Sequence, residues 1–315
     1  MMNLVLLVNG NQLKINKKQS IFKMKKNLKN NVVRMTDTER DLLSQIRNFQ
    51  QTTTSEQQVI YETVSYQDGE LWLVLPDVHR PFHNQILWEK ILQIIKKLGS
   101  QLSGVVLSGD YLDLFTLGSY NANSLGLLKD ITLEEEYLDG LKGIEELQDA
   151  LHSNTARVYI YGNHEDRYFR EINKLDNAKY GNTLKDPVEA LKLKEYGYKV
   201  LTNWKDDIYT VGDIDITHGV YCNIHSAKKH LDMNGNNVMF GHSHRMQTFC
   251  NGNETGYNIG CMIDLKSPYF NYMPRMQRNI WTNGFSFITV DEQNKSHVEL
   301  IKVDNSTFYW RGKKY

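Results

Sequence analysis

The sequence predicts a mixed α/β fold in which two mixed β-sheets are flanked by helices, with a small extension before them. Between about residues 70 and 165, short apolar runs rich in Val, Ile and Leu alternate with segments of helical periodicity. After about residue 205, strand-like runs follow one another at short intervals. The first 66 residues are polar or basic and lack this alternation, so we expect them to lie outside the sheets.

The first 35 residues form a basic segment. Eight of the 37 Lys and Arg residues lie there and none of the 37 Asp and Glu residues does, so the rest of the chain has an excess of eight acidic residues. Such an arm can contact nucleic acid, but a solvated leader is the simpler interpretation and the one that we favour. Asn9 and Gly10 lie between two apolar-leaning runs and predict a hairpin turn. Met24 is a second candidate for the start of translation.

A short helix and a linker are predicted between this arm and the main domain. Thr36 followed by Glu39 is a capping-box pattern, and it opens a helix predicted over residues 36–49. The polar run after the helix is typical of a linker. We therefore divide the chain into a basic N-terminal extension, residues 1–66, and a main domain, residues 67–315.

The main domain begins with strands and helices in alternation. Strands covered on both faces bury every side chain, so they read as continuous apolar runs. Such runs are LWLVLP (71–76), GVVLSGD (104–110) and VYIYGNH (158–164), followed after residue 205 by DIDITHG, NVMFGHSH, GYNIGC, GFSFITV and HVELIKV. One helix is predicted over residues 86–98, and another begins at a capping box formed by Thr132 and Glu135.

The composition argues against a membrane protein and against a disulfide-stabilised one. Hydrophobic residues make up 40% and charged residues 23% of the chain. No apolar run approaches the roughly 18 residues that a membrane span requires. The three cysteines are odd in number and lack C-x-x-C spacing. We therefore expect a cytoplasmic protein in a reducing compartment, with no membrane partner.

Five of the predicted strands end in side chains that commonly bind metals. They are Asp77 and His79, Asp110 and Asp113, Asn163 and His164, His218, and His242 and His244. Each motif alone is more typical of a turn or of a hydrogen-bonded core residue. Together they predict one pocket, because ligands bind beyond the strand ends of open α/β sheets. Converging carboxylates repel one another unless a cation binds them, and this mixture of donors suits a divalent transition metal.

These motifs, in order, resemble the five signatures of calcineurin-like metallophosphoesterases: D-x-H, G-D-x-x-D, G-N-H-E, H-G and G-H-x-H. The resemblance covers about residues 68–303. The opening DVHRPFH and the closing NIGC and NGFSFI runs are most similar to the group found in phages and bacteria. The resemblance implies a four-layer α-β-β-α sandwich and two adjacent divalent ions. Manganese is the first expectation, with Fe, Zn, Ni or Mg as alternatives.

The resemblance also implies a role for each site residue. The first ion would be held by Asp77, His79 and His244, the second by Asn163, His218 and His242, and Asp110 would bridge them. A metal-bound hydroxide would attack phosphorus in line. His164 would be the general acid, with Asp113 accepting a hydrogen bond from its other ring nitrogen and favouring its charged form.

The substrate is less well defined by the sequence. Leu114 and Arg80 stand where related protein phosphatases carry arginine and glycine, which disfavours a phosphoprotein substrate. A phosphodiesterase, including a DNA or RNA nuclease, is the favoured hypothesis. The alternatives are a phosphomonoesterase acting on nucleotides and a non-catalytic binding scaffold. Arg80, His83 and Arg167 are candidate substrate contacts, although bracing of the loop is the first expectation for both Glu165 and Arg167. The oligomeric state is left open.

Overall fold

A computed structural model describes residues 5–8, 11–14, 69–119, 130–174 and 184–315. The chain divides into two units, Met1–Ser65 and Tyr66–Tyr315. In the first unit, β1 (Val5–Val8) pairs antiparallel with β2 (Asn11–Lys14), which is the hairpin expected there. Its two turn residues, the predicted helix over residues 36–49 and the linker lie outside the described residues. The proposed organisation of the N-terminal extension therefore stays a prediction.

The second unit contains a six-stranded sheet, here called the first sheet, in the order β13-β12-β3-β4-β5-β6. Its strands are β3 (Glu70–Leu75), β4 (Leu102–Ser108), β5 (Ala156–Ile160), β6 (Lys199–Leu201), β12 (Asn283–Val290) and β13 (Ser296–Val303). Strands β3 to β6 are parallel to one another, whereas β12 is antiparallel to both β3 and β13. The parallel strands consequently end at the same edge of the sheet.

The second sheet has five strands in the order β10-β11-β9-β8-β7. Its strands are β7 (Tyr209–Val211), β8 (Ile214–Ile216), β9 (Val238–Phe240), β10 (Met246–Asn251) and β11 (Glu254–Ile259). Strand β9 is parallel to β8 and to β11, while β7 and β10 are antiparallel edge strands. Both sheets are therefore mixed. A separate hairpin near the C-terminus consists of β14 (Tyr309–Trp310) and β15 (Lys313–Lys314).

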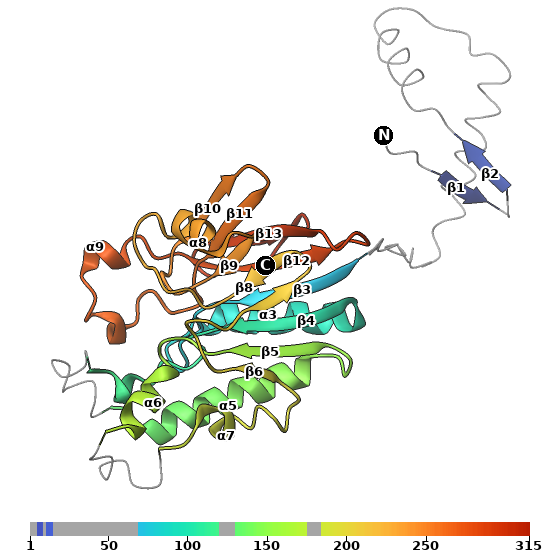
Figure 1. Ribbon diagram of the computed structural model, residues 1–315. Coiled ribbons are helices and arrows are strands. Elements are labelled where there is room, and N and C mark those ends of the chain that lie inside the picture. The colour runs from blue at the N-terminus through green and yellow to red at the C-terminus, as the bar shows by residue number, and fades with distance from the viewer. Residues whose placement is uncertain (1–4, 9–10, 15–68, 120–129, 175–183) are drawn as a thin grey trace, which may run out of the picture. The chain divides into compact units, whose positions relative to one another are not determined.

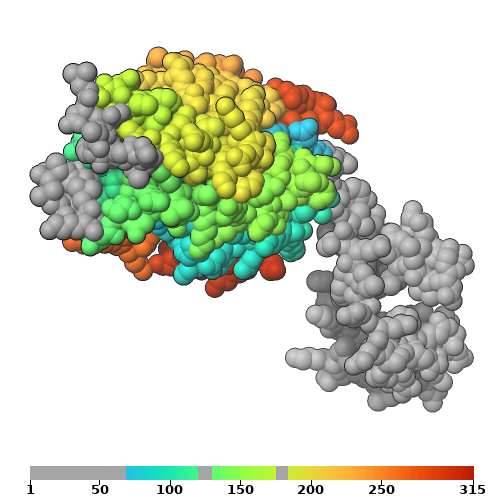
Figure 2. All heavy atoms as spheres, turned by 90° about the horizontal axis from the view of Figure 1, so that it is seen from below, coloured from blue at the N-terminus to red at the C-terminus, as the bar shows by residue number. Residues whose placement is uncertain are grey.

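Two long helices belong to the first half of the second unit. They are α3 (Gln85–Leu98) and α5 (Leu133–Ala150), and the shorter helices are α6 (Asp166–Ile172), α7 (Pro187–Ala190), α8 (Ser226–Asn234) and α9 (Arg275–Arg278). Single 3-10 turns occur at Gly99–Gln101, Phe115–Leu117 and Pro268–Phe270. Seen from below, the surface is made mainly by green to yellow segments, the part of the chain with α5, α6 and α7 (Figure 2). Within the described ranges, no helix combines the length and apolarity needed to cross a bilayer.

These elements form four layers (Figure 1), and apolar side chains pack between them. Alternate residues of a strand point to opposite faces, so Leu73 of β3 packs with α3 and α5 while Val74 faces the second sheet. In the second sheet, Met239 of β9 faces the first sheet, and its neighbour Phe240 packs with Leu231 of α8. The order is helices, sheet, sheet, helix. This confirms the predicted α-β-β-α sandwich with two mixed sheets.

Most elements of the second unit were predicted from the sequence. The capping box of α5 is present: the Thr132 side chain accepts from the Glu135 amide, and the Glu135 carboxylate accepts from the Thr132 amide at 2.8 Å. Strands β6, β7, β10, β14 and β15 and helices α6, α7, α8 and α9 were not predicted. Strands of three residues such as β6 and β7 contain too little periodicity to identify, and β10 is a mostly polar edge strand.

Candidate metal centre

The side chains singled out at the strand ends lie together in the structure. Strands β3, β4 and β5 are parallel, so the residues that follow them meet at one edge of the first sheet. Strands β8 and β9 are also parallel and end beside that edge. The seven residues brought together are Asp77, His79, Asp110, Asn163, His218, His242 and His244. Three groups of three His or Asp residues here are close enough to bind a metal ion.

The first group consists of Asp77, His79 and His244, all buried. Nε2 of His79 lies 3.1 Å from Nε2 of His244, which is 3.3 Å from Oδ1 of Asp77. Both oxygens of Asp77 also accept from the backbone N–H of His242 at 2.9 Å. One oxygen and two ring nitrogens thus converge on a single point.

The second group consists of Asp110, His218 and His242, with Asn163 beside them. Nε2 of His218 lies 3.0 Å from Oδ1 of Asn163, 3.1 Å from Nδ1 of His242 and 3.3 Å from Oδ2 of Asp110. The same Asp110 oxygen is 3.7 Å from Nε2 of His79 in the first group. Asp110 therefore lies between the two groups, the position required of a bridging ligand.

Five of these residues have a left-handed backbone. The angle φ is 43° at Asp77, 53° at His79, 49° at Asp110, 58° at His242 and 57° at His244. A non-glycine residue in such a conformation costs of order 1–3 kcal/mol unless its surroundings fix it. Strained residues of this kind collect at functional sites, so their concentration in one pocket supports a functional role.

Glycines beside the ligands leave room for their side chains. A Cβ at Gly241 would lie 1.7 Å from Oδ2 of Asp77, and one at Gly162 would lie 2.0 Å from Oδ1 of Asp110. A Cβ at Gly109 would lie 2.4 Å from Nδ1 of His218. The recurrence of glycine in G-D, G-N-H and G-H therefore has a steric cause, because each of these positions touches a ligand from another strand.

The carboxylates of the site favour positive charge. Burial lowers the pKa of His79, but the hydrogen bond and charge of Asp113 and the charge of Asp110 outweigh this effect, and the pKa is raised. Burial likewise lowers the pKa of His218, but the charge and hydrogen bond of Asp110 outweigh this effect and raise the pKa to about 9. Burial raises the pKa of Asp110, but His164 and His218 hold it well below its usual value. A cation is stabilised in such a potential.

The donor set fits divalent metal ions. Nδ1 of His79 contacts Oδ2 of Asp113 at 2.8 Å, and Nδ1 of His218 contacts the backbone carbonyl of Ser108 at 3.3 Å. An outer partner of this kind orients a metal-binding imidazole and leaves its other nitrogen for the ion. Burial and the charge of His218 lower the pKa of His242 to about 4, so this ring offers a lone pair. These clusters can bind metal.

His164 has a different hydrogen-bond partner from the one predicted. Its Nδ1 donates to the backbone carbonyl of Asp113 at 2.7 Å, whereas the Asp113 carboxylate is 3.7 Å away and pairs with His79. Burial and the charge of Arg167 hold the pKa of His164 well below its usual value. These surroundings favour the neutral imidazole, and the predicted hydrogen bond between His164 and the Asp113 carboxylate is not formed. Asp113 lies between two imidazoles, and only the tertiary structure determines which one its carboxylate meets.

Glu165 and Arg167 fix the loop that follows β5. The Glu165 carboxylate accepts from the amides of Asp110, Leu112 and Gly162 at 3.1, 2.9 and 2.8 Å. The predicted bracing role of Glu165 is therefore confirmed. Arg167 donates to the backbone carbonyl of Asp113 at 2.9 Å and to Nε2 of His164 at 3.1 Å. Arg167 stays at the site, and its contact with substrate remains a prediction.

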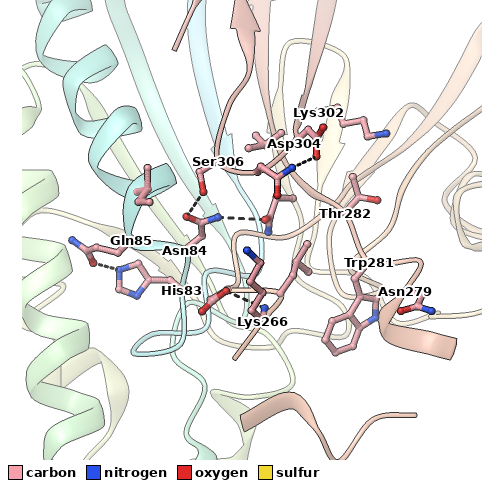
Figure 3. Close-up of a pocket in the computed structure, with 16 residues that line it drawn as sticks. His83, Asn84, Gln85, Lys266, Asn279, Trp281, Thr282, Lys302, Asp304 and Ser306 are labelled. Atoms are coloured by element: carbon pink, nitrogen blue, oxygen red, sulfur yellow. Dashed lines mark hydrogen bonds between the residues drawn. The ribbon is translucent and has the colours of Figure 1, made fainter. Parts of the chain in front are cut away.

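Arg80 and His83 are not among the residues that line the cavities at the candidate metal centre, so the structure does not support their predicted contact with substrate. Arg80 is 1% exposed, and its Nε donates to Asp139 at 2.7 Å. His83 lines a different cavity of about 660 Å³, where its Nε2 donates to Gln85 at 2.8 Å (Figure 3). After His79 the chain turns toward α3 and α5, which sequence adjacency could not reveal.

Two cavities open at the candidate metal centre. One, of about 240 Å³, is lined by Asp110, Asn163, His164, His242, His244 and Arg245 among others. The other, of about 380 Å³, shares Asn163 and His242 with it and is also lined by Arg167, Arg170, Trp204 and Lys205. The sequence analysis missed Arg245 and Trp204. Arg245 directly follows the G-H-x-H motif and could have been noticed there, but Trp204 lies outside every motif.

No family model matches the chain, and no curated protein matches it in sequence. Solved structures similar to it include zinc-bound Vps29 from Entamoeba histolytica, with 13% identity and a TM-score of 0.38 over 78% of this chain and 96% of that one. Vps29 from Cryptosporidium parvum has 13% identity and a TM-score of 0.36 over 78% and 95%. A predicted phosphoesterase from Streptococcus pneumoniae has 12% identity and a TM-score of 0.32 over 78% and 97%. These values are low, so the fold and the site rest on the geometry described above.

Proposed function

We propose that this chain is a metal-dependent phosphoester hydrolase of the calcineurin-like, phage and bacterial type, acting on a phosphodiester. The observation that carries the proposal is the meeting of seven ligand-type side chains from five strand ends, in two groups with Asp110 between them. One divalent ion would be held by the first group and one by the second, with manganese as the first choice. When bound, such a pair supplies charge neutralisation at the phosphate and a water molecule acidic enough to ionise near neutral pH.

The protein's own side chains would then orient the metal ligands and protonate the leaving group. Asp113 fixes the ring of His79 through Nδ1, so it is a positioning residue for the first ion. Nε2 of His164 is 3.8 Å from Oδ2 of Asp110 and therefore faces the centre. Negative charge on a bound phosphate favours the protonated ring, which would then donate its Nε2 proton to the leaving alkoxide. Arg167, which donates to that nitrogen in the structure, would turn toward the phosphate.

The two cavities favour a diester over a monoester. They meet at Asn163 and His242, which belong to the second group of ligands. A phosphate held there has space on both sides, so a substrate with a substituent on each ester oxygen can be accommodated. A monoester fills only one side and leaves the other cavity to water.

The larger of these two cavities also suits a nucleic-acid strand. Arg167, Arg170 and Lys205 line it, and Asp166 is the one carboxylate among its lining residues. Trp204 lies in the same wall, with its ring 6.2 Å from that of His242. Cations for the backbone and an aromatic ring for a base are the usual elements of single-strand binding. DNA and RNA oligonucleotides are therefore the substrates to be tried first.

The test combines metal analysis with two model substrates. Purified protein loaded with manganese should hold two ions per chain and should hydrolyse bis-p-nitrophenyl phosphate faster than p-nitrophenyl phosphate. His218→Gln should lose metal and activity, because Nε2 of His218 contacts three other ligands. His297→Gln is the matched control, since His297 is exposed and pairs only with Asp291 among the described residues.

The possible results distinguish the three candidate functions. Faster hydrolysis of the monoester would replace the diesterase by a phosphomonoesterase. Metal binding without hydrolysis of either ester or of single-stranded DNA would favour a non-catalytic binding scaffold. A protein that binds no divalent ion would end the proposal.

A further inference from the structure

Arg245 presents a guanidinium with two unpartnered nitrogens to the candidate metal centre. It directly follows His244 and lines the cavity of about 240 Å³ together with Asp110, His164 and His242. Its Nε and Nη1 atoms are shielded from solvent, and neither has a hydrogen-bond partner in the described part of the chain. No carboxylate of the described residues forms an ion pair with it.

Arg245 is half-buried as a residue, but its Nε and Nη1 are shielded from solvent. Shielded N–H donors without a partner are costly, above all on a group that is always charged. Asp110 is the one carboxylate among the residues that line this cavity. It is already engaged, because its Oδ1 accepts from the His164 amide at 2.8 Å and its Oδ2 lies 3.3 Å from Nε2 of His218. The protein therefore leaves the guanidinium to an anion that enters from the cavity.

We infer that Arg245 binds a non-bridging oxygen of the substrate's phosphoryl group. This inference rests on the proposed function, since it assumes that the phosphoryl group is held beside His244 and Asp110. A tetrahedral oxyanion offers several acceptor oxygens, so a guanidinium N–H of Arg245 that points into the cavity can donate to one of them. Arg245 would bind the phosphoryl group on the side away from Arg167, which lines the other cavity.

The inference is tested by the binding of inorganic phosphate to the manganese-loaded full-length protein, measured by calorimetry. Arg245→Gln should weaken phosphate binding about 10- to 100-fold, the range for a lost hydrogen bond to a charged group. Arg245→Lys should retain part of the affinity, because it keeps the charge but loses the fork. Metal content should be the same in all three proteins, because Arg245 is not among the grouped ligands.

Arg157→Gln is the matched control. Arg157 also has a shielded Nε without a partner among the described residues, but it lies on β5 and its Nη1 donates to Thr155 at the opposite end of that strand. Its replacement should leave phosphate affinity unchanged. Wild-type affinity in Arg245→Gln, loss of metal from that variant, or an equal loss in Arg157→Gln would each overturn the inference.

Hydrolysis measurements keep this inference separate from the proposed function. In an active enzyme, Arg245→Gln should raise KM by a factor similar to the loss of phosphate affinity. If the wild type hydrolyses no phosphoester but binds phosphate through Arg245, the hydrolase proposal fails and the anion site stands. If the wild type is active and phosphate affinity does not depend on Arg245, the hydrolase stands and the anion site fails.

Discussion

At the scale of single residues, hydrogen bonds decide what each histidine of the centre can do. His79 and His218 each have one ring nitrogen held by an oxygen, through Asp113 and the carbonyl of Ser108. Their other nitrogens are thereby directed at the ligand groups. His164 is held by a backbone carbonyl as well, but its remaining nitrogen faces Arg167, which keeps the neutral ring favoured. Similar residues at neighbouring strand ends thus acquire different chemical roles.

The general-acid role of His164 predicts a dependence on the leaving group. His164→Gln should slow the hydrolysis of a diester with a poor alkoxide leaving group by about 10²- to 10⁴-fold, the usual contribution of a general acid. It should affect bis-p-nitrophenyl phosphate much less, because p-nitrophenolate leaves without a proton. Steady-state kinetics with both substrates checks this. An equal loss on the two substrates would assign His164 to binding instead of proton transfer.

His230, which is not itself a proposed metal ligand, predicts how stability depends on pH. Its Nδ1 donates to the Ser226 carbonyl and its Nε2 accepts from the Val220 amide at 2.9 Å, so the folded protein needs the neutral ring. Burial, together with the charges of His218 and Lys229, lowers its pKa to about 4. The unfolded chain binds the proton near pH 6.5, so this contribution to stability is complete above about pH 6.5 and is lost as the pH falls toward 4.

His230→Gln removes that pH dependence. At neutral pH the variant should be less stable than the wild type by about 1 kcal/mol, because a hydrogen bond at Nε2 is lost or weakened. The difference should shrink between about pH 7 and about pH 5, since only the wild type then has a histidine to keep neutral. Urea unfolding at both values measures it. A difference that does not change with pH would contradict the assigned cause.

At the scale of secondary-structure elements, the strand-to-loop turns shape the centre. After β3, β4, β5 and β9 the chain passes through a glycine or a residue of positive φ at or just before the first ligand, whereas after β8 the glycine, Gly219, follows the ligand His218. Gly109 has both features: its φ is 93°, and a Cβ there would meet His218 on another sheet. The turn after β4 therefore packs closely against His218, which follows β8.

Gly109→Ala should impair metal binding more than folding. A comparable glycine, Gly235 at the end of α8, has φ of 76° and open space around it. Alanine at either position should destabilise the protein by about 1–2 kcal/mol through the left-handed backbone. Only Gly109→Ala should also weaken manganese binding, because its Cβ displaces the His218 ring. Equilibrium dialysis compares the two, and equal affinities would show that the contact with His218 is unimportant.

At the scale of the whole molecule, the candidate metal centre joins the two sheets. Asp77, Asp110 and Asn163 follow strands of the first sheet, while His218 and His242 follow strands of the second. Each of the two ligand groups contains residues from both sheets. A bound ion would therefore hold the sheets together at their shared edge, in addition to the apolar contacts between them.

Metal removal should lower the stability of the second unit. An ion that binds only the folded state at about 100 times its Kd adds about 2.7 kcal/mol to the free energy of unfolding. Chelation followed by addition of manganese should therefore lower and then restore Tm. A chain that starts at Tyr66 should show the same shift, because all seven ligands lie in the second unit. The absence of a shift, or a shift that needs residues 1–65, would contradict this account.

The sequence alone was sufficient for the features that depend on local order along the chain. Continuous apolar runs identified β3, β4 and β5, and the capping box identified the start of α5. Ligand types at five strand ends indicated nine candidate residues for one pocket, and the family resemblance implied which seven of them would hold metal. Each of these signals is contained in a few consecutive positions. The fold then brings them together because parallel strands share an edge.

Only the tertiary structure decided which groups meet across the pocket. In the structure, Arg80 donates to Asp139 of α5, and the Asp113 carboxylate pairs with His79. Arg245, with Nε and Nη1 unpartnered among the described residues, lines the cavity beside His244. The physical reason is that a side chain's partner depends on the path of other segments through space. Neighbouring positions in sequence, such as His79 and Arg80, can therefore point into different surroundings, and no local pattern records which.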